Sequence, residues 1–158
     1  MADVKFEDNS MKVKAAIDEA LLQFLEEAAA TLQSQAEDNT PRDSSNLFKS
    51  WDHKVDESKM EATIGSPLEN AIWTEFGTGE HALKNNGRQS AWYVPIEKVT
   101  GKKKPSFNGK VVIVYGKNGQ KYYKTNGKKP VRMLFNAFSA KKNAIIRMAE
   151  ELFKERLK

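Results

Sequence analysis

Residues 11–37 read MKVKAAIDEALLQFLEEAAATLQSQAE, and their apolar positions repeat at intervals of three and four. Because an α-helix has 3.6 residues per turn, this spacing collects Val13, Ile17 and Leu21 on one face and leaves charged side chains on the other. The pattern stops at Pro41, since a proline drives the residue before it out of the helical region. The stretch therefore predicts a long amphipathic helix over 11–37.

Residues 131–157 carry a second pattern of the same kind. Pro130 precedes it, and a proline is well tolerated where a helix begins. The spacing predicts a second long helix over 131–157. Its apolar positions are Leu134, Phe135, Phe138, Ile145, Ile146, Ala149, Leu152 and Phe153.

Two β-hairpins are predicted between the helices. Residues 51–66 form two short runs of alternating character around a polar turn. Residues 111–124 form two apolar or aromatic runs around Asn118-Gly119, and an Asn-Gly pair is a strong hairpin signal.

A short helix is predicted over 68–76, where Leu68, Ile72 and Phe76 recur at intervals of four. Gly77 is expected to end it in a left-handed cap. Residues 77–109 are rich in glycine, asparagine and lysine and are expected to be mainly loops, with a possible strand over 91–96.

The order helix, strands, strands, helix favours an α+β fold, with an antiparallel sheet of two hairpins packed by the long N-terminal and C-terminal helices. A chain of 158 residues suits one core, so residues 1–158 are expected to form a single domain. The chain has no cysteine, which excludes disulfides, thiolate metal sites and a thiol nucleophile. Residues 1–14 contain no apolar run that could target or cross a membrane, so no membrane partner is expected.

The charge is distributed unevenly along the chain. Residues 1–80 hold 7 Lys and Arg against 17 Asp and Glu, whereas residues 81–158 hold 19 against 4. If the two halves are separated in space, an acidic surface of one copy attracts a basic surface of the next, which favours head-to-tail assembly. The alternative is that the charges interleave in the folded chain and only keep it soluble.

No catalytic equipment is recognisable. The only histidines, His53 and His81, are not at a metal-ligand spacing, and no G-x-S-x-G motif is present. The run Gly77-Thr78-Gly79 lacks the lysine and the strand-to-helix context of a phosphate-binding loop. We therefore predict no enzyme, no catalytic residue, no metal and no cofactor.

The basic half permits a second interpretation as a DNA-binding module. Lysines surround Tyr115, Tyr122 and Tyr123, a combination found on surfaces that bind single strands. Tyr122 and Tyr123 must face opposite sides of a strand, so at most one of them joins a stacking row. The candidate contacts to DNA or a partner are Lys102, Lys103, Lys104, Lys128 and Lys129.

Three blocks of the sequence resemble a family of small phage neck and tail-completion proteins. Residues 40–50, TPRDSSNLFKS, are similar to its T-P-x-D-T-G-x-L-x-x-S pattern. IGS at 64–66 and AIWTEFGTG at 71–79 resemble its V-G-[ST] strand and Y-A-x-x-[VQ]-E-F-G-T segment. Residues 127–138, GKKPVRMLFNAF, resemble its G-x-x-P-x-x-F-L-x-x-A-F entry into the last helix. The chain departs from the family pattern at Ser44-Ser45, Asn70 and Met133.

The resemblance implies a structural virion protein of a tailed phage, which completes the tail or joins head and tail as a subunit of a sixfold or twelvefold homo-oligomeric ring. It implies as partners further copies of the chain, the connector, tail terminator or tail tube proteins, and possibly DNA in the channel. It implies assembly in the host cytoplasm and a final place in the neck. The residues that carry the motifs are Pro41, Leu47, Ser50, Gly65, Ala71, Glu75, Phe76, Gly77, Thr78, Gly79, Pro130, Leu134, Ala137 and Phe138.

Glu75 calls for a partner, because a carboxylate at the C-terminal end of a helix is unfavourable to the helix dipole. We expect a lysine or arginine of the basic half to pair with it, within the subunit or across an interface, and Phe76 to anchor the short helix in the core. The loops over 77–90 and 101–109 are expected to contact a neighbouring protein or DNA.

Overall fold

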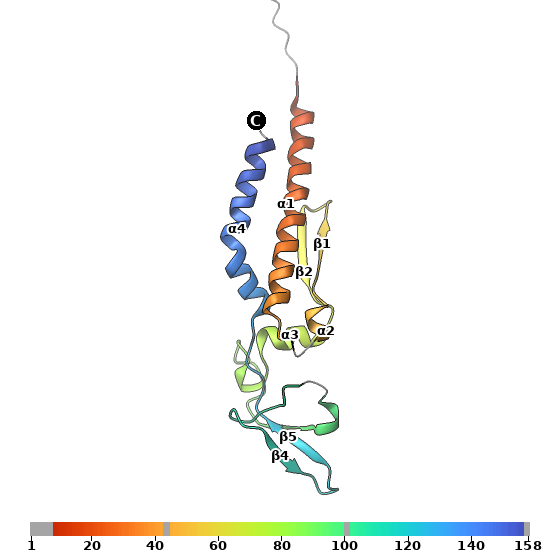
Figure 1. Cartoon of the computed structure of the whole chain (residues 1–158), viewed down its shortest axis with the longest axis vertical. Helices are drawn as coiled ribbons and strands as arrows, with labels where there is room; N and C mark the ends of the chain where they lie inside the picture. The colour runs from red at the N-terminus through yellow and green to blue at the C-terminus, as the bar shows by residue number, and fades with distance from the viewer. Residues whose placement is uncertain (1–7, 43–44, 100–101, 157–158) are drawn as a thin grey trace, which may run out of the picture.

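The computed structural model describes residues 8–42, 45–99 and 102–156. Its longest elements are two helices, α1 (Ser10–Asn39) and α4 (Met133–Arg156). They pack side by side and run in opposite directions (Figure 1). At one end of the pair, Asn39 Nδ2 donates a hydrogen bond to the carbonyl of Met133, 3.0 Å away. Four alanines are buried on α1, and such small side chains leave room for its neighbours to approach closely.

A two-stranded antiparallel hairpin packs against α1. It consists of β1 (Asp52–Asp56) and β2 (Glu61–Gly65), with Val55 opposite Ala62 in the register. His53 lies half-buried between β1 and α1, where its Nδ1 is 2.5 Å from Gln33 Oε1. The hairpin therefore extends the helical part of the molecule on one side of α1 (Figure 1).

A three-stranded antiparallel sheet lies at the opposite end of the molecule from the free ends of the long helices (Figure 1). Its order is β3 (Trp92–Pro95), β5 (Lys121–Thr125), β4 (Val112–Tyr115). Two short 3-10 turns, η1 (Gly79–His81) and η2 (Ile96–Lys98), flank β3 in the chain. We call the part formed by residues 82–99 and 102–125 the β-module.

Two small helices connect these parts. α2 (Ser45–Phe48) is a single turn ahead of β1, and α3 (Glu69–Phe76) lies across the bases of the long helices (Figure 1). The core lies at this junction. Trp51 is buried there, and its Nε1 donates to Thr40 Oγ1 at 2.7 Å, which in turn donates to the carbonyl of Ala36. The buried core residues are Ala36, Leu47, Trp51, Ala71, Met133 and Ala137.

The predicted α+β class, with long N-terminal and C-terminal helices and two antiparallel hairpins, is confirmed. The two hairpins do not join into one sheet packed by both helices, because β5 pairs with β3 and β4 instead of reaching β1 or β2. β3 arises within residues 77–109, the segment expected to be mainly loops, at the possible strand over 91–96. No helix in the described ranges is long and apolar enough to span a bilayer.

The structure also shows where the unevenly distributed charges lie. Residues 81–130 contain twelve Lys and Arg and one acidic residue, Glu97, and most of this segment is the β-module. The acidic α1 and hairpin lie away from it (Figure 1). Within the helical part, however, α4 packs beside α1, so basic and acidic residues lie next to one another there. The basic charges of the β-module are therefore separated from the acidic charges of α1 and the hairpin, whereas acidic and basic charges interleave where α4 packs against α1.

Candidate assembly interface

Two segments that are far apart in the sequence run side by side where the helical part meets the β-module. The N–H of Val131 donates to the carbonyl of Thr74 at 2.8 Å, and the N–H of Thr78 donates to that of Lys128 at 2.9 Å. The N–H of Glu80 donates to the carbonyl of Asn126 at 3.0 Å. We call this arrangement of residues 74–80 and 126–131 the clasp. It brings together the second and third motif blocks.

Glycines make the close approach in the clasp possible. Gly77 has φ +74° and ψ 174°, an extended conformation with positive φ that is essentially restricted to glycine. A Cβ at Gly77 would lie 2.8 Å from the carbonyl oxygen of His81 and 2.9 Å from that of Lys128. Gly77 does end α3 as predicted, but not in the left-handed helical conformation, because the chain turns directly into the clasp.

Gly79 and Gly127, like Gly77, lie too close to the opposite segment of the clasp to carry a side chain. A Cβ on Gly79 would collide with the carbonyl oxygen of Asn126, and one on Gly127 with that of Thr78. Both residues also have positive φ. The G-T-G run is therefore needed for backbone packing, which explains its composition without any bound phosphate.

Side chains reinforce the clasp. The N–H of Lys128 donates to Thr78 Oγ1 at 3.0 Å, and the Nζ of Lys128 donates to Thr74 Oγ1, also at 3.0 Å. Asn126, which is buried, donates from Nδ2 to Glu80 Oε2 at 2.9 Å. Each of these bonds joins the same two segments, so they hold the β-module to the helical part.

Glu75 caps the N-terminus of α4. Its Oε2 accepts a hydrogen bond from the N–H of Leu134 at 3.0 Å, and its Oε1 accepts one from the N–H of Phe135 at 3.1 Å. The first N–H groups of a helix lack partners within the helix, and the positive end of its dipole attracts an anion. Glu75 is only 7% exposed, so this cap lies inside the subunit.

The type of group expected to pair with Glu75 was predicted incorrectly. The partner lies within the subunit, but it is a pair of backbone N–H groups and not a lysine or arginine side chain. The expected burial of Phe76 was also wrong, since its side chain is 49% exposed. The reason is that α3 buries Ala71, Thr74 and Glu75, which leaves Ile72 and Phe76 outside its buried face. Leu68, the first position of the predicted series, does pack against the core.

Large apolar side chains are exposed on both helices that meet at this junction. On α3, Ile72, Trp73 and Phe76 are all about half exposed or more. On the first turns of α4, Phe135 and Phe138 are half exposed as well. The hydrogen bond that the N–H of Phe135 donates to Glu75 joins the two helices at this point. We call these five residues the waist face.

The motif residues thus fall into distinct places. Leu47, Ala71 and Ala137 are buried in the core, and Leu134 packs against it. Ser50 Oγ hydrogen-bonds Ser66 Oγ at 2.7 Å beneath α3, and Pro41 and Gly65 are half-buried on either side of that region. The clasp holds Glu75, Gly77, Thr78, Gly79 and Pro130, and the waist face holds Phe76 and Phe138.

The candidate lysines lie in two different places. Lys102, Lys103 and Lys104 are exposed in the segment between η2 and β4 of the β-module. Lys128 and Lys129 are in the clasp, where Lys128 is engaged by Thr74 and Thr78. Lys128 is therefore a structural residue of the junction, whereas the lysines at 102–104 are exposed on the β-module.

Ile72, Trp73, Phe135 and Asn126 were not identified as site residues from the sequence. The sequence contained a usable signal for Ile72, Trp73 and Phe135. An eight-residue helix reading ENAIWTEF has more large apolar side chains than one buried face needs, and Phe135 adds to the apolar width of α4. Asn126 had no such signal, because its role depends on the clasp. Among the described residues, no group of three or more His, Cys, Asp or Glu is arranged to hold a metal ion.

Comparison with known proteins gives one match. The model of the family described as "Bacteriophage HK97-gp10, putative tail-component" matches residues 4–77, just under half of the chain. This stretch is similar to that family of phage tail components. The match runs from before α1 to Gly77, so it covers the first motif block and all of the second except Thr78 and Gly79, and it ends in the clasp.

The match suggests a structural phage tail protein, and hence a place in the virion. It agrees with the resemblance carried by the motif blocks at 40–50 and 64–79. No curated protein and no solved structure matches the chain.

Proposed function

We propose that this HK97-gp10-like protein is an assembly subunit of the phage neck, which completes the tail or joins it to the head as part of a homo-oligomeric ring. It acts by presenting surfaces to other virion proteins and performs no chemistry. Its neighbours in the proposal are further copies of itself and connector, tail terminator or tail tube proteins. The sixfold or twelvefold symmetry of such a ring follows from the family resemblance alone.

The waist face is the observation that supports this proposal. Trp73, Phe76, Phe135 and Phe138 are each about half exposed. At ~200 Å² for a whole aromatic side chain, they offer roughly 400 Å² of apolar surface. Apolar patches of this size on soluble proteins commonly mark interaction sites, and aromatic residues contribute strongly to binding at such sites.

The rigid support beneath the waist face strengthens the interpretation. Glu75 fixes the start of α4 relative to the end of α3, and Gly77 leads directly into the clasp. The aromatic side chains are therefore carried on elements whose relative position is held by hydrogen bonds. A preorganised surface loses less conformational entropy on binding than a flexible one.

A complementation experiment tests the proposal. Phage lacking this gene product should accumulate filled heads and unattached tails, visible by negative-stain electron microscopy, and wild-type protein supplied in trans should restore infectious particles. The double variant Trp73→Ser/Phe76→Ser should fold but restore fewer than about one tenth of the particles, because a lost interface hot spot weakens binding by 2 kcal/mol or more.

The matched control is Met11→Ser/Val13→Ser, which removes two exposed apolar side chains at the far end of α1. This variant should restore particles to the wild-type level. Normal joining of heads and tails without the protein would refute the neck function. Full rescue by the waist-face variant would show that the waist face is not the surface through which the protein joins heads and tails.

DNA contact is the second candidate function, favoured by the twelve basic residues against one acidic residue in residues 81–130. The exposed Lys102, Lys103 and Lys104 would contact phosphates, and such contacts weaken steeply as salt rises. Fluorescence anisotropy with a labelled oligonucleotide at 50 and 200 mM salt measures this dependence. Absence of binding at 50 mM would exclude the function.

A further inference from the structure

The strand β4 forms an open edge of the three-stranded sheet, because the strand order is β3-β5-β4. Residues 111–115 read VVIVY and contain no charge. Alternate side chains of an extended segment lie on the same face. Here Val111, directly before β4, is 55% exposed, and Ile113 and Tyr115, within β4, are 46 and 68% exposed. We call these three residues the β4 ridge. Open apolar edges of this kind are sites at which other chains dock.

Basic residues border the β4 ridge at both ends. Lys110 and Lys117 are exposed immediately before and after it, and Lys121 lies opposite Tyr115 in the register, with Nζ 5.7 Å from its ring centre. These lysines disfavour the pairing of two β4 edges with each other, since like charges would meet. They favour an acidic occupant for the ridge.

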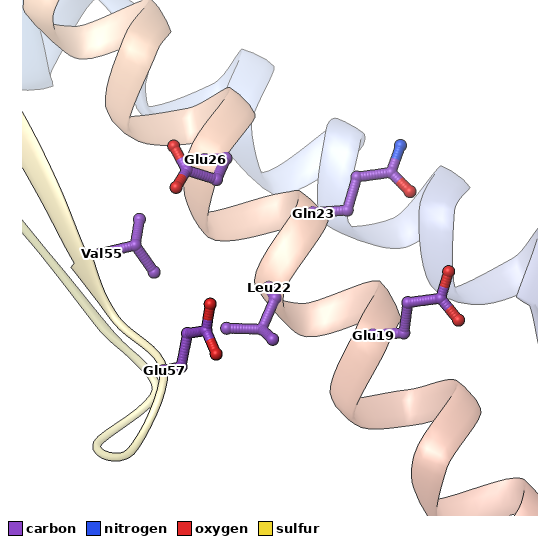
Figure 2. A pocket seen from close by; sticks show the side chains of 6 residues that line it. All are labelled: Glu19, Leu22, Gln23, Glu26, Val55 and Glu57. Carbon is purple, nitrogen blue, oxygen red and sulfur yellow. The ribbon is translucent and has the colours of Figure 1, made fainter.

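A surface with the opposite character lies between α1 and the β1–β2 hairpin. It is a shallow hollow of about 300 Å³, lined by Glu19, Leu22, Gln23, Glu26, Val55 and Glu57. Figure 2 shows Leu22 and Glu26 of α1 pointing toward the hairpin, and Val55 and Glu57 pointing back toward α1. The hollow thus combines apolar side chains with carboxylates, as the ridge combines apolar side chains with lysines.

We infer that the β4 ridge of one copy docks into the hollow between α1 and the hairpin of a second copy. The inference deepens the proposed ring function and rests on it. Leu22 and Val55 face the apolar ridge, while Glu26 and Glu57 meet the lysines that border it. The β4–β5 hairpin lies at one end of the molecule and the β1–β2 turn lies far from it beside α1 (Figure 1), so one chain cannot make this contact with itself.

Such a contact is heterologous, because two different surfaces of the chain meet. Each copy offers one ridge and one hollow, so every subunit has two neighbours. A heterologous contact closes into a ring when its rotation divides a full turn, and otherwise grows into a filament. The contact also gives the assembly a direction, which a junction between unlike structures requires.

Charge exchange between two variants tests the inference directly. In Glu26→Lys/Glu57→Lys the hollow becomes basic, and in Lys110→Glu/Lys117→Glu the surroundings of the ridge become acidic. Sedimentation velocity at low salt should show self-association of the wild type and at least a tenfold weaker self-association of each variant alone. Circular dichroism and thermal unfolding verify that both variants fold.

Mixing the two variants should restore association. Each ridge of the first variant then meets the acidic hollow of the second, and each ridge of the second meets the basic hollow of the first. Only a contact between hollow and ridge predicts rescue by mixing. The apolar part is tested separately by Val111→Ser/Tyr115→Ser, which should weaken association without changing the net charge.

Two controls change charge by the same amount elsewhere. Glu150→Lys/Glu151→Lys alters exposed acidic residues of α4, and Lys102→Glu/Lys103→Glu alters exposed lysines of the β-module outside β4. Both should associate like the wild type. A wild type that stays monomeric at low salt and high concentration would overturn the contact, as would a mixture of variants that stays dissociated.

These outcomes are separable from those of the neck function, which is tested in virions. If the charge-exchange results hold and phage lacking the protein still join heads to tails, the contact stands and the neck function falls. If the purified wild type does not associate and such phage fail to join, the neck function stands and the contact falls.

Discussion

The carboxylate of Glu75 accepts a hydrogen bond from the N–H of Phe135, 60 residues later in the chain, at 3.1 Å. Its second oxygen accepts one from Leu134. A single side chain therefore caps α4 and fixes the end of α3 against it. The acidic residue of the E-F-G-T block therefore has a structural role in this chain, and that role can be measured.

Replacing Glu75 by alanine should lower the free energy of unfolding by about 1–3 kcal/mol, because it leaves two N–H groups at a buried helix end without their acceptor. Urea denaturation followed by circular dichroism measures the loss. Glu75→Gln retains one acceptor oxygen and should lose less. Glu150→Ala, at an exposed position toward the C-terminal end of α4, should stay within about 0.5 kcal/mol of the wild type, and an equal loss there would contradict the capping role.

Alanine substitutions at Gly77 and Gly109 distinguish the effect of steric crowding on stability from the effect of backbone conformation. Their φ values are +74° and +77°, but a Cβ would meet carbonyl oxygens at Gly77 and nothing within 4 Å at Gly109. Gly109→Ala should therefore cost about 1–2 kcal/mol from backbone strain, and Gly77→Ala more than about 3 kcal/mol, since the clasp must also open. Similar melting temperatures for the two variants would show that the clasp is looser than described.

Met133 is completely buried in the core, whereas Met11 is 80% exposed on α1. Truncating a buried methionine to alanine leaves a cavity, so Met133→Ala should destabilise the fold by about 2–5 kcal/mol. Met11→Ala should change stability by less than about 0.5 kcal/mol. Thermal unfolding of both variants checks the difference, and an unaffected Met133→Ala protein would place the core elsewhere.

The turn between β1 and β2 contains a carboxyl group that should titrate abnormally. The pKa of Asp56 lies below the usual value for an aspartate, first because the hydroxyl of Ser58 donates to it and also because the N–H groups of Lys59 and Ser58 do. The ionised form is favoured in the folded state. Its contribution to stability is therefore present above roughly pH 4 and is lost as the pH falls through the lowered pKa.

Ser58→Ala should raise the pKa of Asp56 toward the usual value, and Ser58→Thr, which keeps the hydroxyl, should leave it low. NMR titration of the side-chain carboxyl carbon measures both. An unchanged pKa in Ser58→Ala would assign the shift to the backbone donors alone.

The long helices and the hairpins follow from local patterns in the sequence, and they were predictable for that reason. Apolar spacing of three and four marks α1 and α4, and Asn118-Gly119 marks the turn before β5. What local patterns do not contain is the pairing of distant strands. β5 pairs with β3 on one side and β4 on the other, so the sheet belongs to the β-module and not to the helices.

The orientation of α3 was predicted incorrectly for a related reason. Hydrophobic periodicity assumes that the apolar face is buried, and Phe76 was accordingly expected to anchor the short helix in the core. The structure instead buries Thr74 and Glu75, whose polar atoms are satisfied by the clasp and by α4. A buried carboxylate is acceptable only when its partners are in place, and those partners lie some 60 residues away in the sequence.

The clasp has a consequence for how this protein can diversify. The chain leaves the helical part through residues 76–80 and returns through residues 126–131, and these two segments are hydrogen-bonded neighbours. Everything between them is topologically an insertion whose ends already meet. We therefore expect changes of length or sequence within this insertion to leave the packing of α1 against α4 unaltered, so that the β-module can be replaced while the helical part stays intact.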